Sequence, residues 1–176
     1  MQDELFDIVD AEDRVIGQAT RREVHARGLK HRAVHIFVFD PDGRLLVQTR
    51  SIHKDEDPLL YTSSASGHVD AGETYQEAAR RELEEELGLK PRPMEFLVKL
   101  VAGPETSNEH TVLYRAQCRP DEIAVDPYEI AAVEFVALET VRRWLLEQPQ
   151  KFSSPFQTLL RWYFDRFHSG RQSEPA

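Results

Sequence analysis

Hydrophobic residues recur along the chain in short runs that alternate with polar positions, a pattern typical of β-strands. Runs at 5–10 and 14–20 flank an acidic turn and predict a short hairpin. The clearest hairpin is predicted over 33–50, where two β-rich runs flank Pro41-Asp42-Gly43, residue types that supply the dihedral angles of turns. Further strands are predicted at 94–103, 111–118 and 131–138.

Helical spacing replaces this alternation in the middle and at the end of the chain. The most regular helix is predicted from about Thr74 to Leu87, because Ala79, Leu83 and Leu87 repeat every four residues and Gly88 suits a C-terminal cap. A short helix or turn is predicted at 20–29, and two helices with one apolar face at 139–148 and 154–167. Strands interrupted by a central helix and followed by C-terminal helices indicate an α/β layered domain.

Composition narrows the class of protein. A length of 176 residues suits one domain, which we expect over residues 1–170, followed by a disordered tail over 171–176. The formal net charge of −9 argues against general binding to a nucleic acid polymer, which favours a basic surface. The charge is compatible with a small phosphorylated substrate, because bound Mg²⁺ can reverse the local field.

The compartment is expected to be the cytoplasm. Cys118 is the only cysteine, so no disulfide forms within the chain, which suits a reducing environment. The first ten residues show no signal-peptide pattern, and no apolar run approaches the roughly 18–20 residues needed to cross a bilayer. We therefore expect no membrane partner and either a monomer or a homodimer.

An unusual density of acids marks the central predicted helix. Glu82, Glu85 and Glu86 stand at i, i+3 and i+4 and share one helix face, where like charges cost a few tenths of a kcal/mol per pair. A solvated acidic face is one interpretation of this triplet. A site for hard cations such as Mg²⁺ is the other, since these ions take oxygen ligands and bridge carboxylates to phosphates.

The residues around the triplet favour the cation site. Gly67 is followed after five residues by Glu73 and, after seven more, by Arg81-Glu82. An aliphatic residue, Glu85-Glu86 and Gly88-Leu89 complete the pattern G-x5-E-x7-R-E-U-x-E-E-x-G-U, in which U is aliphatic. This segment resembles the Nudix box at every fixed position.

The resemblance implies the Nudix fold, an α/β architecture in which a mixed sheet lies between helices. It implies Mg²⁺ or Mn²⁺ bound by the three glutamates and by Gly67, with Glu82, Glu85 and Arg81 as catalytic residues. Arg81 would orient the carboxylates, and Glu73 would fix the loop against the helix. Family members mostly hydrolyse a diphosphate linked to another group. Metal ions suit this reaction because they neutralise phosphate oxygens and acidify bound water.

Beyond the box, residues 5–165 resemble the type 1 isopentenyl diphosphate isomerases, a branch with the same fold. This similarity implies that Arg21, Arg50 and Lys54 bind a substrate diphosphate and that Glu109 is catalytic. It also implies a possible second metal site, formed by three histidines close to the positions of that branch's metal ligands: His25, His31 and His68.

Three positions depart from the isomerase pattern. Ser66 stands where the isomerase needs a cysteine acid, and a hydroxyl is a much weaker acid than a thiol. Ser107 replaces a second acidic metal ligand, and Phe156 takes the place of a larger aromatic residue that faces a carbocation. The complete box together with these departures favours an isomerase-like Nudix hydrolase.

The sequence thus predicts a Mg²⁺-dependent hydrolase of a nucleoside diphosphate derivative or related organic diphosphate. An isomerase of isopentenyl diphosphate and a non-catalytic nucleotide sensor are the alternatives. Glu82 and Glu109 are both candidates for the general base. The substrate's leaving group is expected to contact the loops around 51–62 and 103–110, whereas His35 is expected to be structural or solvent-facing.

Overall fold

The computed structural model describes residues 3–168, so the tail predicted over 171–176 lies outside the described residues. Its strands and α-helices follow one another in this order: β1 (Leu5–Val9), β2 (Val15–Thr20), α1 (Arg21–Arg27), β3 (His31–Phe39), β4 (Leu45–Arg50), β5 (Tyr61–Thr62), β6 (Ala65–His68), α2 (Tyr75–Leu87), β7 (Glu95–Leu100), β8 (Glu109–Gln117), β9 (Ile130–Val136), α3 (Leu138–Glu147) and α4 (Ser154–Phe167). The predicted helices and the strands predicted after residue 90 are therefore confirmed to within a few residues.

The main sheet is mixed and is organised around β3. This strand pairs in parallel with β8 along its whole length, from His31 opposite Glu109 to Phe39 opposite Gln117. β7 continues the sheet antiparallel to β8, while β4 pairs antiparallel with β5 and β9. The N-terminal β1–β2 hairpin is confirmed as a separate two-stranded sheet.

The hairpin predicted over 33–50 is confirmed only beside its turn. Its two strands form, but they pair with each other only at Phe39 and Leu45, beside the predicted turn. β6 pairs with the first half of β3 instead. Where β3 and β4 diverge, the Ser64 hydroxyl accepts from the Val38 N–H at 2.8 Å and donates to the Leu46 carbonyl at 2.6 Å. A polar segment therefore separates the two strands.

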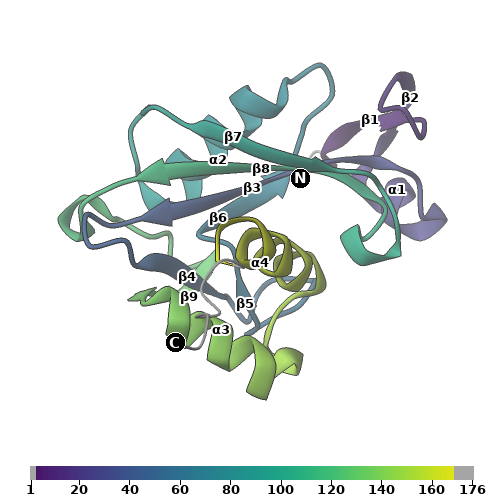
Figure 1. Ribbon diagram of the computed structural model, residues 1–176. Coiled ribbons are helices and arrows are strands. Elements are labelled where there is room, and N and C mark those ends of the chain that lie inside the picture. Colours follow the sequence, from purple (N-terminus) through teal and green to yellow (C-terminus); the bar gives the residue numbers. More distant parts are fainter. Residues whose placement is uncertain (1–2, 169–176) are drawn as a thin grey trace.

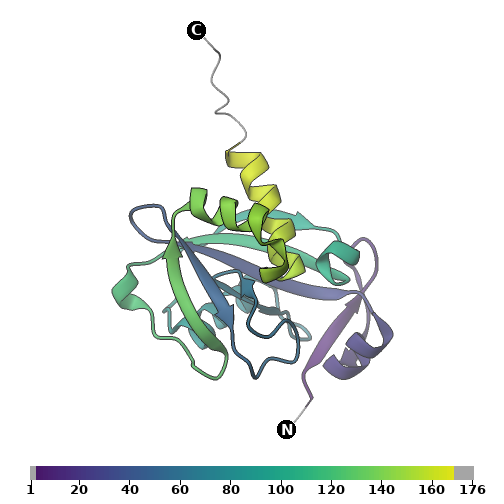
Figure 2. The same cartoon turned by 90° about the horizontal axis from the view of Figure 1, so that it is seen from below.

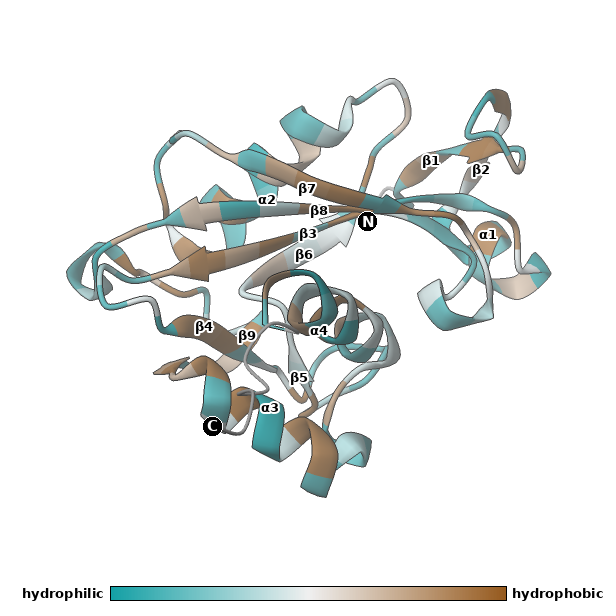
Figure 3. Cartoon of the chain, in the orientation of Figure 1, coloured by the Kyte–Doolittle hydropathy of each residue, from teal (hydrophilic) through white to brown (hydrophobic). Residues whose placement is uncertain are grey.

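Helices cover both faces of the sheet, as the resemblance implied (Figure 1). Val34, Ile36 and Val38 of β3 belong to a buried cluster with α2, whereas the alternate residues Phe37 and Phe39 belong to a cluster with α3 and α4. Figure 2 shows α3 and α4 together on one side of the strands, and Figure 3 shows hydrophobic colours along the central strands. A strand buried on both faces explains the nearly continuous apolar run of β3.

The N-terminal hairpin and α1 lie together beside one end of this sheet (Figure 1). Thr20 caps α1 by accepting from the Glu23 N–H, and the Glu23 side chain accepts from the Thr20 N–H in return. Gly28 ends the helix in the left-handed conformation, with φ of 60°. None of the helices within residues 3–168 is long and apolar enough to cross a membrane.

Candidate active site

The central helix α2 starts and ends where local capping dictates. Thr74 accepts from the Glu77 N–H while the Glu77 side chain accepts from the Thr74 N–H, so both ends of a capping box are present. Gly88 closes the helix with φ of 65°, and a Cβ there would lie 2.9 Å from the Ala124 carbonyl oxygen. These caps set the ends of the helix, and the spacing of Glu82, Glu85 and Glu86 places them on one of its faces.

Close approach between β6 and α2 requires a glycine at position 67. A Cβ on Gly67 would lie 2.0 Å from Oε1 of Glu82, so the carboxylate occupies the space that a side chain would fill. β6 is held in place by pairing with β3, where Gly67 lies opposite Val34. The glycine of the box thus allows the helix carboxylate to lie directly on the strand.

Arg81 links the acids to one another and to the loop before the helix. Its guanidinium donates to Glu73 at 2.9 Å, to Glu82 at 2.6 Å, to Glu85 at 3.3 Å and to the His68 carbonyl at 3.0 Å. These bonds raise the pKa of Arg81 above its usual range, the hydrogen bond to Glu73 contributing most. The arginine therefore offsets part of the repulsion among the acids.

Two of the three helix carboxylates are buried, and Glu85 is exposed. Burial, reinforced by the neighbouring Glu86 charge, raises the pKa of Glu82 to about 8. Burial also raises the pKa of Glu86 to about 7, although this group accepts from Gln48 at 3.0 Å and from the Ser66 N–H at 3.1 Å. A pair of buried carboxylates with raised pKa values favours a bound cation.

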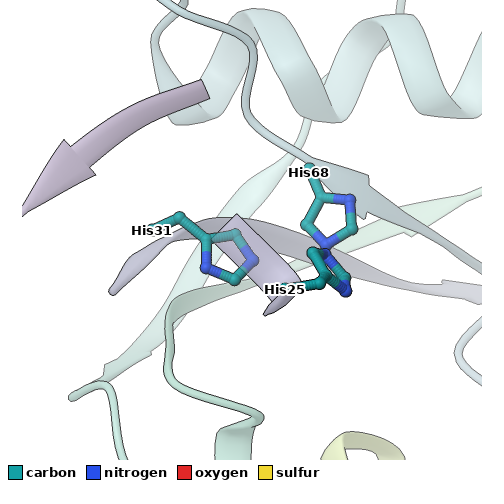
Figure 4. Close-up of side chains that lie close together, drawn as sticks. All are labelled: His25, His31 and His68. Atoms are coloured by element: carbon teal, nitrogen blue, oxygen red, sulfur yellow. The ribbon is translucent and has the colours of Figure 1, made fainter. Parts of the chain in front are cut away.

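A second cluster of metal-binding side chains lies beside the first. His25 of α1, His31 of β3 and His68 of β6 each offer a ring nitrogen, and these atoms lie within 4.8 Å of one another. Figure 4 shows the three rings converging from different elements. Glu109 of β8 joins them, with its Oε1 3.0 Å from Nε2 of His68 and 3.4 Å from Nε2 of His31.

The hydrogen bonds of His31 fit a ligand for a metal ion. Its Nδ1 lies 2.9 Å from the Leu29 carbonyl oxygen, which accepts only, so Nδ1 carries the proton. Its Nε2 is buried, makes no hydrogen bond within residues 3–168 and lies 3.4 Å from Oε1 of Glu109. A cation shared by this nitrogen and the Glu109 carboxylate would stabilise the arrangement.

Glu109 is buried and ionised. Burial alone would raise its pKa, but His31 and His68 beside it hold the pKa well below the usual range for a carboxyl group. Imidazole and carboxylate together suit Zn²⁺ or Mn²⁺. The donor set of the histidine cluster therefore fits a transition-metal ion, whereas the glutamates of α2 fit Mg²⁺ or Mn²⁺.

The three cations predicted for diphosphate binding also line this region. Arg21 donates to Asp55 at 3.0 Å, and Arg50 donates to a backbone carbonyl in the loop after β4 at 3.0 Å. Lys54 forms an ion pair with Glu129, which precedes β9. Each of the three cations is thus held in place by an acid or a backbone carbonyl beside the cleft.

The glutamates of α2, Arg81 and the three cations line one cleft with a volume of about 550 Å³. Of the histidine cluster, His68 and Glu109 line it as well, whereas His25 and His31 lie behind them. Among the described residues, ten carboxylate side chains and four cationic side chains line it. Within residues 3–168, Ala33 and Pro155 alone line the cleft with apolar side chains. An anionic substrate would be repelled by so many acids unless cations were bound with it.

Comparison with known proteins identifies the family. The NUDIX domain matches residues 29–162, which is most of the chain. The chain belongs to the Nudix family. An uncharacterised Nudix hydrolase of Streptomyces coelicolor is 50% identical over 101 residues, covering 56% of this chain and 55% of that protein. The matched stretch thus spans about half the length of that relative.

The isomerase branch of the Nudix family is also represented. An isopentenyl-diphosphate Δ-isomerase of Serratia proteamaculans is 46% identical over 169 residues, covering 90% of each chain. The crystal structure of DR0079 from Deinococcus radiodurans superimposes with a TM-score of 0.79 at 26% identity, covering 90% of this chain and 98% of that one. These relatives confirm the Nudix fold and the isomerase-like branch.

Of the three positions that depart from the isomerase pattern, two line the cleft and one does not. Ser66 and Ser107 line it, whereas Cys118 is buried in the core on the α2 side of the sheet. Phe156 does not face the cleft as its sequence position suggested. It is fully buried against Phe37 and Phe152, and its neighbour Pro155 lines the cleft instead.

Sequence reasoning missed the residues that support the buried acids from the sheet side. Gln48 is fully buried in β4 and donates to Glu86, and its only signal was a polar residue within a hydrophobic strand. His35 is buried, as one of its two expected placements required, and bonds Ser63 at 2.7 Å. It also lines the cleft, which the sequence did not indicate.

Proposed function

We propose that this Nudix protein hydrolyses the diphosphate linkage of a nucleoside diphosphate derivative or a related small organic diphosphate, with Mg²⁺ or Mn²⁺ as cofactor. The observation that carries the proposal is the composition of the cleft. Acids of α2 line one part of it, and Arg21, Arg50 and Lys54 line it as well. This combination suits a phosphorylated substrate bound together with divalent cations.

The roles of the acids follow from their surroundings. Glu82, Glu85 and Glu86 would hold Mg²⁺, with Arg81 fixing two of these carboxylates by direct hydrogen bonds. A bound Mg²⁺ would neutralise phosphate oxygens and make water more acidic. Arg21, Arg50 and Lys54 would bind the outer phosphate and orient the linkage that is cleaved.

We place the general base on α2, at Glu82. The other candidate, Glu109, directs Oε1 toward His31 and His68, which leaves this oxygen committed to the histidine cluster. Glu82 lies over Gly67 in the wall of the cleft, so its carboxylate would face a water that attacks a phosphate bound there. A base needs such a position within hydrogen-bond distance of the proton that it removes.

Hydrolysis is tested by product release from a panel of nucleoside di- and triphosphates, nucleotide sugars, dinucleotides and isopentenyl diphosphate, with and without Mg²⁺. Glu86→Gln should abolish metal-dependent turnover. The matched control is Glu84→Gln, an exposed residue of the same helix outside the box pattern, which should retain it. Absence of turnover with the whole panel would contradict the proposal.

Isomerisation of isopentenyl diphosphate is the second candidate, favoured by the similarity to the Serratia proteamaculans isomerase. Two features of the cleft weigh against it. Ser66 supplies no thiol acid, and a cleft with so few apolar side chains offers a hydrocarbon chain little favourable contact. Isomerisation by the natural chain, measured by NMR of isopentenyl diphosphate, would support this candidate, and isomerisation gained in Ser66→Cys would show that the remaining site is competent.

A further inference from the structure

The loop of residues 51–60, between β4 and β5, is attached to α1 at two points. Asp55 accepts from Arg21 at 3.0 Å, and Oε1 of Glu56 lies 2.6 Å from Nδ1 of His25. The second contact brings a carboxylate from a loop distant in sequence to a member of the histidine cluster. Neither the box nor the predicted histidine set includes it.

Glu56 contacts both the histidine cluster and a cation of the cleft, through different atoms. Its side chain contacts His25, and its backbone carbonyl accepts from Nε of Arg50 at 3.0 Å. Lys54, two residues earlier, lines the same cleft. A single residue thus connects the histidine cluster with the loop that carries cations for phosphate.

The contact also orders the His25 ring. This side chain is partly exposed, comes from a helix of seven residues and packs against the rings of His31 and His68. A carboxylate at Nδ1 favours the proton on that nitrogen, which directs Nε2 to a metal ion. His31 is oriented in the same way by donating Nδ1–H to the Leu29 carbonyl, with its Nε2 3.4 Å from Oε1 of Glu109.

We propose that Glu56 is the outer carboxylate of a transition-metal site formed by His25, His31, His68 and Glu109, and that it couples metal binding to the position of the loop 51–60. The proposal goes beyond the proposed function and rests on the histidine cluster as a metal site. Carboxylates that hydrogen-bond to ligating histidines fix ring orientation and ligand basicity, and their loss typically lowers metal affinity about 10–100-fold. Glu56 acts as a positioning residue because its side chain acts through His25.

The direct test is a titration with Co²⁺ in excess Mg²⁺, followed by visible absorption. Mg²⁺ fills the oxygen-rich site of α2, and Co²⁺ has the greater affinity for imidazole. Glu56→Ala should weaken cobalt binding about 10–100-fold. Glu56→Gln keeps an oxygen that accepts from Nδ1–H and should restore most of the affinity.

Asp57→Asn is the matched control. Asp57 belongs to the same loop, lines the same cleft and has φ of 48°, a left-handed conformation that asparagine tolerates. The substitution removes the same charge without touching the contact to His25, so cobalt affinity should change by less than about threefold, as expected for a solvent-screened charge. Equal affinity in Glu56→Ala and the natural chain, equal losses in Glu56→Ala and Asp57→Asn, or no cobalt binding by the natural chain would each overturn the proposal.

Coupling to the loop is measured by trypsin cleavage after Arg50 and Lys54. Cobalt should protect these bonds in the natural chain and in Asp57→Asn, but not in Glu56→Ala at a cobalt concentration that saturates the variant. Protection of all three proteins would refute the coupling. Neither experiment measures hydrolysis, so a failure of the proposed catalytic function remains distinguishable from a failure of this site.

Discussion

Single residues determine how closely the carboxylates of the active site approach one another and the neighbouring strand. Gly67 provides space for the Glu82 carboxylate, and Arg81 contacts the acids that surround it. Burial then makes these acids weak enough to be partly protonated near neutral pH in the absence of metal. The site is therefore built to hold carboxylates at a separation that a cation stabilises.

Gly67→Ala should displace the Glu82 carboxylate, because the added Cβ would overlap it. A misplacement of about 1 Å in a catalytic site can cost roughly 10²-fold in rate, so we expect a loss of that order in kcat/KM. Gly17→Ala is the control, since an added Cβ there meets no atom within 4 Å. Similar kinetics for both variants would contradict this role of Gly67.

His35 should make stability depend on pH. Burial, together with Arg50 and His68, lowers its pKa from 6.5 to about 4. The unfolded chain therefore binds more protons between these values, and the contribution of the neutral ring, present above pH 6.5, is lost as pH falls toward 4. Up to roughly 3 kcal/mol of the free energy of unfolding is involved.

His35→Asn keeps a polar group near Ser63 and removes this titration. Urea unfolding of both proteins at several pH values should give a difference in the free energy of unfolding that changes between pH 6.5 and 4, with the natural chain losing more. A difference that stays constant across this range would show that His35 does not titrate as expected.

At the scale of elements, α2 depends on local capping signals and on long-range contacts with β3, β4 and β6. Its capping box and its C-terminal glycine are both readable in the sequence, and both are present. The two strands of the predicted hairpin, in contrast, pair with each other only beside the turn, and β6 pairs with the first half of β3. Local sequence decided which segments form strands. The partner of each strand was decided by the other strands that can bind the same edge.

Thr74→Ala should remove the N-terminal cap of α2 and lower the free energy of unfolding by about 1 kcal/mol, because the Glu77 N–H loses its acceptor. Urea denaturation followed by circular dichroism measures this change. Thr74→Ser retains the hydroxyl and should restore most of the stability. A serine variant as unstable as the alanine variant would assign the loss to the methyl group instead.

For the whole molecule, the ionised Glu86 carboxylate is expected to lower the free energy of unfolding in the absence of metal but to be needed for binding Mg²⁺. Burial raises the pKa of this carboxyl, so its contribution to stability is greatest below the ordinary value of 4.5 and is lost as pH rises through about 7. At pH 8.5 in EDTA, Glu86→Gln should therefore be more stable than the natural chain by about 1 kcal/mol or more.

The same variant should lose the stabilisation that Mg²⁺ gives the natural chain, which is about 2.7 kcal/mol at 100 times the dissociation constant. Thermal unfolding with EDTA and with Mg²⁺ measures both effects, with Glu84→Gln as the control for charge on the same helix. A Glu86→Gln protein that is less stable in EDTA, or that Mg²⁺ stabilises as strongly as the natural chain, would contradict the expectation.

The sequence by itself determined the helices, most strands and the Nudix box. It also identified four of the ten acids and all four cations that line the cleft within the described residues. These features depend on side-chain periodicity, capping and turn chemistry, which act over a few residues. Only the tertiary structure decided that Ser64 separates β3 from β4, that Phe156 lies in the core, and that Glu56 reaches His25. Such contacts join residues far apart in the chain, and they form only when strand pairing and burial have been settled together.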